Sequence, residues 1–85
     1  MDQKNKTLII IPAYNEGDNI EKVVDNLIIN FPQYDYVIVN DGSRDHTKRV
    51  CSSRRYEVLN LPINMGIGGA VQTGYRYARD NDYDI

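Results

Sequence analysis

The sequence has only one cysteine and one histidine among its 85 residues. Cys51 cannot form an internal disulfide, so this is not a small fold held together by bridges, and we expect a half-buried thiol. His46 has no cysteine or histidine neighbour at ligand spacing, which argues against a zinc site. No apolar run approaches the ~18 residues of a membrane span, and the first residues do not resemble a signal peptide. We therefore expect a cytoplasmic chain without a membrane segment.

An excess of charge of one sign is also lacking, because 10 Lys and Arg stand against 12 Asp and Glu. This balance gives no reason to expect a nucleic-acid or anionic-membrane partner. A local basic run lies within positions 44–55. We expect it to be a solvated helix face, with phosphate contact as the alternative. Its members are Arg44, Lys48, Arg49, Arg54 and Arg55.

What the chain does have is a series of buried-type strands. Residues 7–11 (TLIII) and 36–39 (YVIV) have the continuous apolar pattern of strands covered on both faces. Residues 56–61 are a third strand candidate, and residues 83–85 look like the beginning of a fourth. Helical patterns alternate with these strands, which predicts an α/β fold. The expected architecture is a Rossmann-like parallel half-sheet of about three to four strands with helices on both faces.

Three helices are expected between the strands. Asp18 and Glu21 have the spacing of a capping box before a helix of about four turns. Ser43 or Asp45 can cap a short second helix that turns Val50 and Cys51 inward. The third helix is expected over residues 70–78. It contains Gly74, whose cost of roughly 1 kcal/mol relative to alanine suggests close packing against the sheet.

Three unusual loops each follow a strand, and the carboxyl ends of parallel strands meet at one edge, where ligands bind. The loops are 11–16 (IPAYNE), 40–45 (NDGSRD) and 64–70 (NMGIGGA). Asp41 can accept hydrogen bonds from a nucleoside base or ribose. Gly42 permits close backbone approach, and a helix opened by Ser43 would favour an anion.

A dinucleotide-binding fold is the obvious alternative, because Gly66 and Gly68 form a Gly-x-Gly pair. The third glycine of that fingerprint would fall at Val71, and the first strand-to-helix turn contains PAYNE instead of phosphate-cradling glycines. The fingerprint is therefore not met.

The stretches IIIPAYNEGDNI, VIVNDGSRDHT and NMGIGGAVQTGYRYA, in this order and spacing, resemble the start of a family 2 glycosyltransferase with the GT-A fold. Within that family the chain looks most like the dolichyl- or polyprenyl-phosphate sugar transferases. The resemblance implies that residues 1–85 are a partial GT-A nucleotide-sugar-binding domain, truncated at the fourth strand before the Asp-x-Asp motif.

The resemblance also implies a donor site for a nucleoside diphosphate sugar of the uridine or guanosine type. Asp41 would hydrogen-bond the base or ribose, with Asn64 and Gly66 beside them. Ile67 stands where many relatives have a basic residue. The remaining residues implied to border the nucleoside are Pro12, Ala13, Tyr14 and Glu16.

The family's reaction is an inverting displacement assisted by Mg²⁺ or Mn²⁺, with a lipid-phosphate or saccharide as the acceptor. The stretch Asp80–Asp84 matches Asp-x-Asp literally, but it precedes a strand and so points to the wrong edge of the sheet. We reject it as the metal site. Neither metal ligands nor a catalytic base are then expected in these residues, and the 85 residues alone are expected to be inactive.

Two hypotheses remain open. One is the donor-binding segment of a glycosyltransferase, located in the cytoplasm, with the full-length enzyme at the cytoplasmic face of a membrane. The other is a stand-alone nucleotide-binding or interaction module without catalysis. The natural residues after Ile85 distinguish the two. Because so few strands are present, we also expect the sheet edge to be shielded by self-association.

Overall fold

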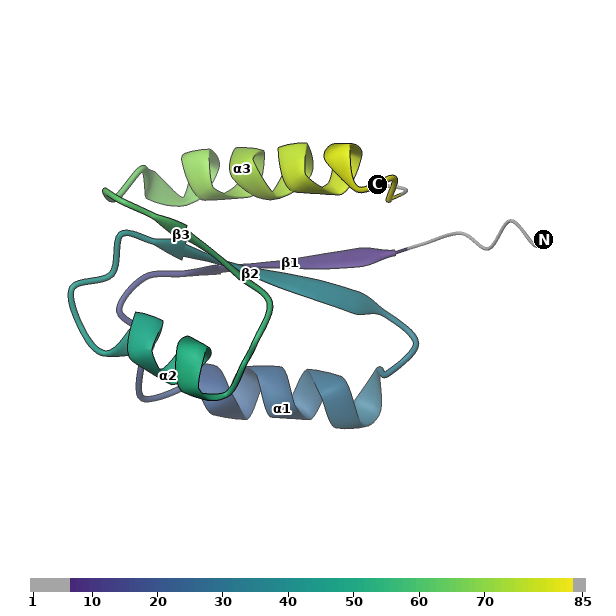
Figure 1. Ribbon diagram of the computed structural model, residues 1–85, viewed down its shortest axis with the longest axis horizontal. Coiled ribbons are helices and arrows are strands. Elements are labelled where there is room, and N and C mark those ends of the chain that lie inside the picture. Colours follow the sequence, from purple (N-terminus) through teal and green to yellow (C-terminus); the bar gives the residue numbers. More distant parts are fainter. Residues whose placement is uncertain (1–6, 84–85) are drawn as a thin grey trace.

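The computed structural model describes residues 7–83 and shows a three-stranded parallel sheet between two layers of helices (Figure 1). The strand order is β1-β2-β3, so β2 is central. Helices α1 and α2 lie on one face of the sheet and α3 lies on the other (Figure 1). The predicted α/β half-sheet is confirmed. Its elements are β1 (Leu8–Ala13), α1 (Ile20–Asn30), β2 (Asp35–Asp41), α2 (Thr47–Ser53), β3 (Val58–Leu61) and α3 (Gly66–Asp80).

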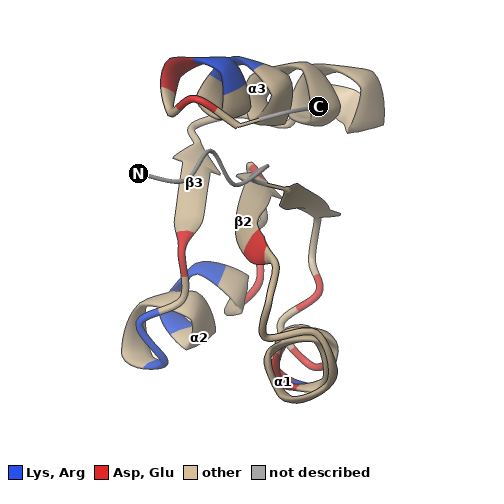
Figure 2. Cartoon of the chain, turned by 90° about the vertical axis from the view of Figure 1, so that its right-hand side faces the viewer, with Lys and Arg blue, Asp and Glu red and all other residues tan. Residues whose placement is uncertain are grey.

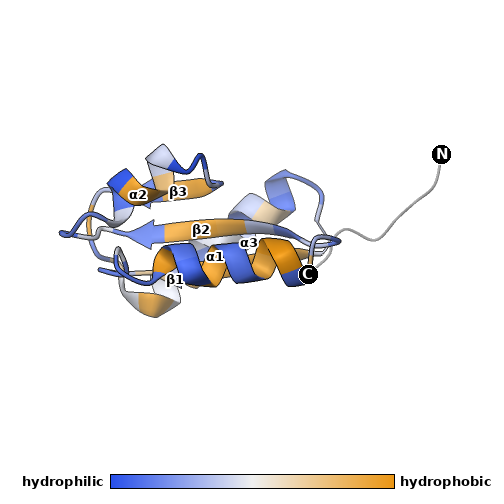
Figure 3. Ribbon diagram, turned by 90° about the horizontal axis from the view of Figure 1, so that it is seen from below, coloured by the Kyte–Doolittle hydropathy of each residue, from blue (hydrophilic) through white to orange (hydrophobic). Residues whose placement is uncertain are grey.

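The central strand β2 is buried on both faces, as its unbroken apolar sequence predicts (Figure 3). Ile38 packs with Val24 of α1 and Cys51 of α2 in the core on one side. Val37 and Val39 are at most 1% exposed, and they alternate with Ile38 toward α3. The sheet therefore has a separate apolar layer on each face.

Helix α3 approaches the sheet closely because its inner stripe consists of small residues. Ala70, Gly74 and Ala78 recur every four residues and are all buried. A Cβ added at Gly74 would lie 2.5 Å from Cγ2 of Ile10 on β1. The close packing predicted from Gly74 is confirmed.

The predicted capping box before α1 is wrong, and of the two residues expected to cap α2 only Asp45 bonds to its first residue. Helix α1 begins at Ile20 with Asn19 as its N-cap and no side-chain cap hydrogen bond, so the capping box does not form. The Asp18 carboxylate instead lies 3.1 Å from Nε2 of His46. Helix α2 begins at Thr47, so Ser43 does not open it. Asp45 does accept the Thr47 N–H, at 2.9 Å.

The third strand and third helix also differ from the prediction. Strand β3 begins at Val58, two residues later than expected, because Tyr56 turns into the core on the α1–α2 side. Helix α3 begins at Gly66, four residues earlier than expected, so the glycines of this segment lie within its first turn. Residues Asp84 and Ile85 of the expected fourth strand lie outside the described residues. Tyr83 is not in a strand, and its N–H donates to the Ala78 carbonyl.

All five basic side chains of the run are exposed, as expected of a solvated helix face (Figure 2). Arg54 is the member with a defined structural role: its guanidinium pairs with Glu21 and Asp25 of α1 and lies 5.4 Å from the ring of Tyr56. Arg54 therefore ties the end of α2 to α1. Cys51 is completely buried rather than half-buried, and burial raises the pKa of its thiol.

Among residues 7–83, no helix has both the length and the apolar character needed to cross a membrane.

Candidate nucleoside site

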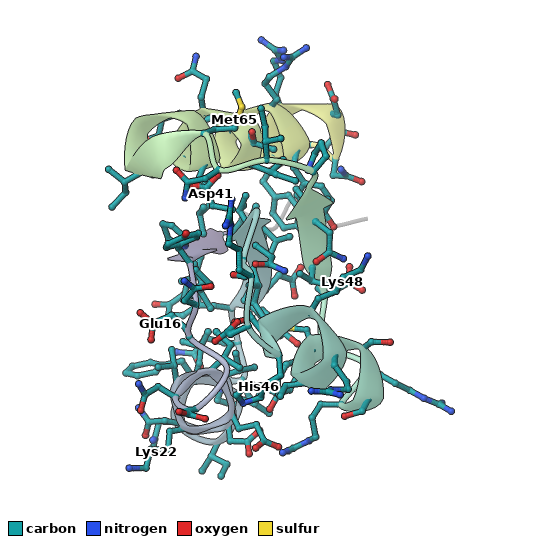
Figure 4. The ribbon with its side chains drawn as sticks, turned by 90° about the vertical axis from the view of Figure 1, so that its left-hand side faces the viewer. Glu16, Lys22, Asp41, His46, Lys48 and Met65 are labelled. Carbon is teal, nitrogen blue, oxygen red and sulfur yellow. The ribbon has the colours of Figure 1, made fainter. Side chains whose placement is uncertain are left out.

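A pocket of about 310 Å³ opens at the carboxyl edge of the sheet, between the ends of β1 and β2 and the start of α3. In Figure 4, which looks onto this edge, Asp41 lies beside Met65 at the start of α3, and Glu16 lies nearer α1. The structure brings all seven residues predicted from the sequence into the lining, and Ile67 and Ala70 complete it. The seven are Pro12, Ala13, Tyr14, Glu16, Asp41, Asn64 and Gly66. Their role as nucleoside contacts stays a prediction.

Asp41 combines a structural role with an accessible acceptor. It is only 4% exposed, and its Oδ1 accepts the backbone N–H of Met65 at 2.6 Å. No group in the described part of the chain donates a hydrogen bond to Oδ2, and no buried side-chain oxygen there lacks a partner. Oδ2 therefore still has access to solvent in the pocket, where it can accept a hydrogen bond from a ligand.

The loop between β3 and α3 is fastened to the end of β2 by two residues. Asn64 donates from Nδ2 to the Asp41 carbonyl at 3.2 Å and accepts the Gly66 N–H through Oδ1, also at 3.2 Å. Gly42 has a left-handed φ of 68°, and a Cβ there would lie 2.4 Å from the Asn64 backbone nitrogen. The close approach predicted at Gly42 is therefore made by the chain's own backbone and not by a ligand.

Polar residues at the end of β2 and directly after it bind the first two loops to each other. Asn40 donates from Nδ2 to Asn60 of β3 and accepts the Ser43 hydroxyl, whose oxygen in turn accepts the Asn15 N–H at 2.9 Å. The Asn15 side chain accepts the Arg44 N–H at 2.8 Å. The anion-binding role expected of Ser43 is wrong, because Ser43 connects loops and does not begin a helix.

Asp45 is a second connection between these loops. Its Oδ2 accepts the Gly17 N–H at 3.0 Å, and its Oδ1 accepts both the N–H and the hydroxyl of Thr47. The Thr47 oxygen accepts the Glu16 N–H at 3.0 Å. The Thr47 hydroxyl bond, followed by the backbone bonds from Thr47 and Gly17, lowers the pKa of the Asp45 carboxyl despite the opposing effect of burial.

We expect Asp45→Ala to reduce the free energy of unfolding by about 2 kcal/mol at pH 7, because hydrogen bonds to the charged carboxylate are lost. The expected loss of unfolding free energy is no larger because Asp45 is exposed to solvent, which screens the charge of its carboxylate. A lowered folded-state pKa gives stability that is present above the unfolded pKa and disappears as pH falls through the folded value. Urea unfolding at pH 7 and pH 3 should therefore show the difference from wild type shrinking at the lower pH.

Asp80→Ala is the matched control for this experiment, because the ion-pair partner found for Asp80 among residues 7–83 is Arg79, at 4.0 Å, and both side chains are exposed. A difference between Asp45→Ala and wild type that stays constant down to pH 2 would contradict the assigned role of the carboxylate.

The pocket does not fit a divalent metal ion by itself. Within residues 7–83, no three His, Cys, Asp or Glu side chains are grouped so that they could hold an ion. The carboxylates in the lining are those of Glu16 and Asp41, and one oxygen of Asp41 is already occupied by Met65. The Mg²⁺ or Mn²⁺ implied by the resemblance finds no ligand set in the described residues.

Sequence reasoning missed the groups that hold the site together. These groups cannot be recognised from local sequence patterns, because their hydrogen-bond partners are about 24 to 31 positions away. They are the Met65 N–H, Asn15, Asp45 and Thr47. Ala70 was not among the residues expected in the pocket, which it lines from the start of α3. A signal was available for Thr47, since a polar residue at the start of a short amphipathic helix is often fully bonded there.

The model of glycosyl transferase family 2 matches residues 8–83 of the chain. A dolichyl-phosphate beta-glucosyltransferase, ALG5A, of Trichomonas vaginalis is 35% identical over 85 residues, covering 84% of this chain and 26% of the relative. An undecaprenyl-phosphate mannosyltransferase of Micrococcus luteus is 32% identical over 85 residues, covering 94% of this chain and 35% of the relative. The chain thus spans about a quarter to a third of these relatives.

A similar solved structure is the mannosyltransferase PcManGT from Pyrobaculum calidifontis, in complex with GDP-Man and Mn²⁺. The TM-score is 0.73 with 23% identity, and the match covers 89% of this chain and 25% of that one. At this identity the similarity concerns the fold: the three parallel strands and their helices have the arrangement of a GT-A glycosyltransferase.

Proposed function

The chain belongs to glycosyl transferase family 2, and we propose that it forms the donor-binding part of an enzyme that transfers a sugar from a nucleoside diphosphate sugar, with inversion, to a lipid-phosphate or saccharide acceptor. The observation that carries this proposal is the pocket at the carboxyl edge, which contains every predicted nucleoside contact. The names of the relatives support a polyprenyl-type phosphate acceptor. We place the segment in the cytoplasm, with the complete enzyme at the cytoplasmic face of a membrane.

In this proposal the nucleoside lies across the ends of β1 and β2. The Oδ2 atom of Asp41 accepts a hydrogen bond from a base N–H or a ribose hydroxyl of a uridine or guanosine nucleotide. Tyr14 is 44% exposed at the rim, so its ring can cover one side of the base. Pro12 and Ala13 form the apolar floor, and Asn64 and Gly66 lie on the opposite wall.

The complete enzyme uses Mg²⁺ or Mn²⁺ in this proposal, with ligands outside the residues described here. The solved mannosyltransferase in complex with Mn²⁺ supports a divalent ion in proteins of this fold. In this proposal the pocket of this chain binds the nucleoside, and residues outside those described here bind the metal ion that neutralises the diphosphate.

Asp41→Asn tests the nucleoside assignment with little disturbance of the fold. The amide oxygen can still accept the Met65 N–H, whereas the amide nitrogen presents a donor where Oδ2 offered an acceptor. We expect nucleotide affinity to fall by about 1 to 3 kcal/mol, roughly 5- to 150-fold. Titrations of the 85-residue chain with UDP and with GDP, followed by amide NMR shifts, measure this change.

Asp82→Asn is the matched control, because it makes the same charge change outside the pocket and asparagine tolerates the φ of 62° found there. Asp41→Ala should lose both affinity and stability, since it also leaves the Met65 N–H without its acceptor. Unchanged nucleotide affinity in Asp41→Asn would remove Asp41 from the donor site.

We also propose that the isolated chain self-associates through β1. Among the described strands, β1 pairs only with β2, and Leu8–Ile11 remain partly exposed although their sequence is that of an interior strand. Sedimentation velocity over a hundredfold concentration range should show a monomer–dimer equilibrium, and a sharp monomer throughout would contradict it.

A further inference from the structure

A second pocket, of about 380 Å³, lies at the opposite edge of the sheet, where β2 and β3 begin. Its volume is in the range of small-molecule sites. Four tyrosines and two carboxylates contribute to its wall, and none of the described residues that line it is Lys or Arg. The lining residues are Leu27, Ile28, Pro32, Tyr34, Asp35, Tyr36, Glu57, Tyr77 and Tyr83.

The tyrosine rings of this pocket are held in place by their own contacts. Tyr36 packs edge-on against Tyr56, with ring centroids 6.4 Å apart, and its hydroxyl oxygen accepts the Glu57 N–H. The Tyr83 hydroxyl donates to Asp35 at 2.7 Å, which raises the pKa of Tyr83 to about 12. Burial, followed by the nearby Glu57 charge, raises the pKa of Tyr77. These phenols therefore stay neutral at physiological pH and present uncharged aromatic rings.

Within residues 7–83, no ion pair neutralises the two carboxylates. Asp35 accepts the Tyr83 hydroxyl through Oδ2, and Glu57 accepts the Tyr77 hydroxyl through Oε2 at 3.4 Å. The ion pairs found within residues 7–83 involve neither Asp35 nor Glu57. Within residues 7–83, each carboxylate thus has no cationic partner, and one oxygen of each receives no hydrogen bond there.

The helices add to the negative potential at this edge. In a parallel α/β layer, helices run opposite to the strands, so α1 and α3 both end near the beginnings of β2 and β3 (Figure 1). Helix C-termini carry partial negative charge. The last turn of α1 contains no basic residue to offset it, whereas the last turn of α3 contains Arg79. Viewed from this edge, the near ends of β2 and β3 are acidic (Figure 2).

We propose that this pocket binds a small organic cation with a quaternary ammonium head. Aromatic faces attract such cations through the ring quadrupole, and the carboxylates and helix ends attract the same charge. Leu27, Ile28 and Pro32 contact its alkyl groups. The site is on the edge of the sheet remote from the nucleoside pocket and shares no residue with it.

The probe is choline, with its uncharged isostere 3,3-dimethylbutan-1-ol as the matched ligand. Amide NMR titration of the 85-residue chain should show shifts at residues 34–36, 57 and 77, with choline binding about tenfold more tightly than the alcohol. Equal affinities for the two ligands, or choline shifts elsewhere on the chain, would overturn the proposal. Saturating UDP or GDP should leave the choline affinity unchanged, so this result does not depend on the nucleotide proposal.

Substitutions of Tyr77 distinguish the contribution of its aromatic ring to choline affinity from that of its hydroxyl. Tyr77→Phe keeps the aromatic face and should retain choline affinity within about twofold, whereas Tyr77→Leu should lose most of it. Glu57→Gln should weaken choline about fivefold, while Asp80→Asn, at the same edge but outside the lining, should change it less than twofold. Far-ultraviolet circular dichroism confirms that each variant is folded. Equal losses in Tyr77→Phe and Tyr77→Leu, or in Glu57→Gln and Asp80→Asn, would contradict the proposal.

Discussion

Gly42→Ala is expected to lower the free energy of unfolding by about 3 kcal/mol. Two penalties add: a non-glycine residue in the left-handed region costs roughly 1–2 kcal/mol, and overpacking typically costs 1–3 kcal/mol. The clash is severe here because the new Cβ meets the backbone of Ile63 and Asn64, both at 2.4 Å, and backbone cannot rotate away as a side chain can. A domain of this size has a total stability of only about 4–13 kcal/mol. Urea unfolding measures the change.

Gly66→Ala is the matched control. Gly66 also has a positive φ, of 82°, but a Cβ there would have no heavy atom within 4 Å. It should therefore show the conformational penalty of about 1–2 kcal/mol without the clash. Equal destabilisation by the two substitutions would mean that the close contact between Gly42, at the end of β2, and the backbone of residues 63–64 adds nothing to the cost of the substitution.

The Gly42 contact also explains why the candidate site has a defined shape. Asp41 immediately precedes Gly42 and binds the Met65 N–H, while Asn64 binds both the Asp41 carbonyl and the Gly66 N–H. The end of β2 and the beginning of α3 are thus one hydrogen-bonded unit. A displacement at Gly42 is expected to open the pocket as well as weaken the fold.

The sequence was sufficient to predict the elements that depend on local pattern. The apolar runs of β1 and β2 and the apolar periodicity of α1 identified those elements, and the cost of Gly74 indicated its close packing with Ile10. The seven pocket residues could be assembled because parallel strands bring their carboxyl ends to one edge. Their roles came from family resemblance and not from this geometry.

The starts of α1 and α3 were predicted wrongly because hydrogen bonds to residues distant in the sequence determine where these helices begin. The glycines after Met65 suggested a loop, yet Asp41 and Asn64 satisfy the first N–H groups of the segment, so the helix begins at Gly66. Asp18 had the spacing of a cap, but residues before α1 are held by Asp45 and Thr47. Such partners lie about 24 to 31 positions away and cannot be read from a window of a few residues.

The candidate nucleoside pocket has acidic but no basic side chains among its described lining residues. These residues include Glu16 and Asp41 but no Lys, Arg or His, and Ile67 occupies the position where the resemblance gives many relatives a basic residue. The partial positive charge at this edge is that of the beginning of α3, equivalent to about half an elementary charge. This charge cannot balance a nucleoside diphosphate, so binding by these residues alone should be weak and dominated by the nucleoside.

We expect the 85 residues by themselves to transfer no sugar. The departing diphosphate finds no cationic side chain among the described residues of the pocket lining, and residues 7–83 hold no ligand set for a divalent ion that could stabilise it. Loss of this stabilisation by a metal ion costs several kcal/mol of barrier. The test incubates the chain with UDP- and GDP-sugars, Mn²⁺ and lipid-phosphate acceptors while released nucleoside diphosphate is measured. Turnover that is abolished by Asp41→Asn but not by Asp82→Asn would show that the pocket is catalytically complete, contrary to the charges of its lining.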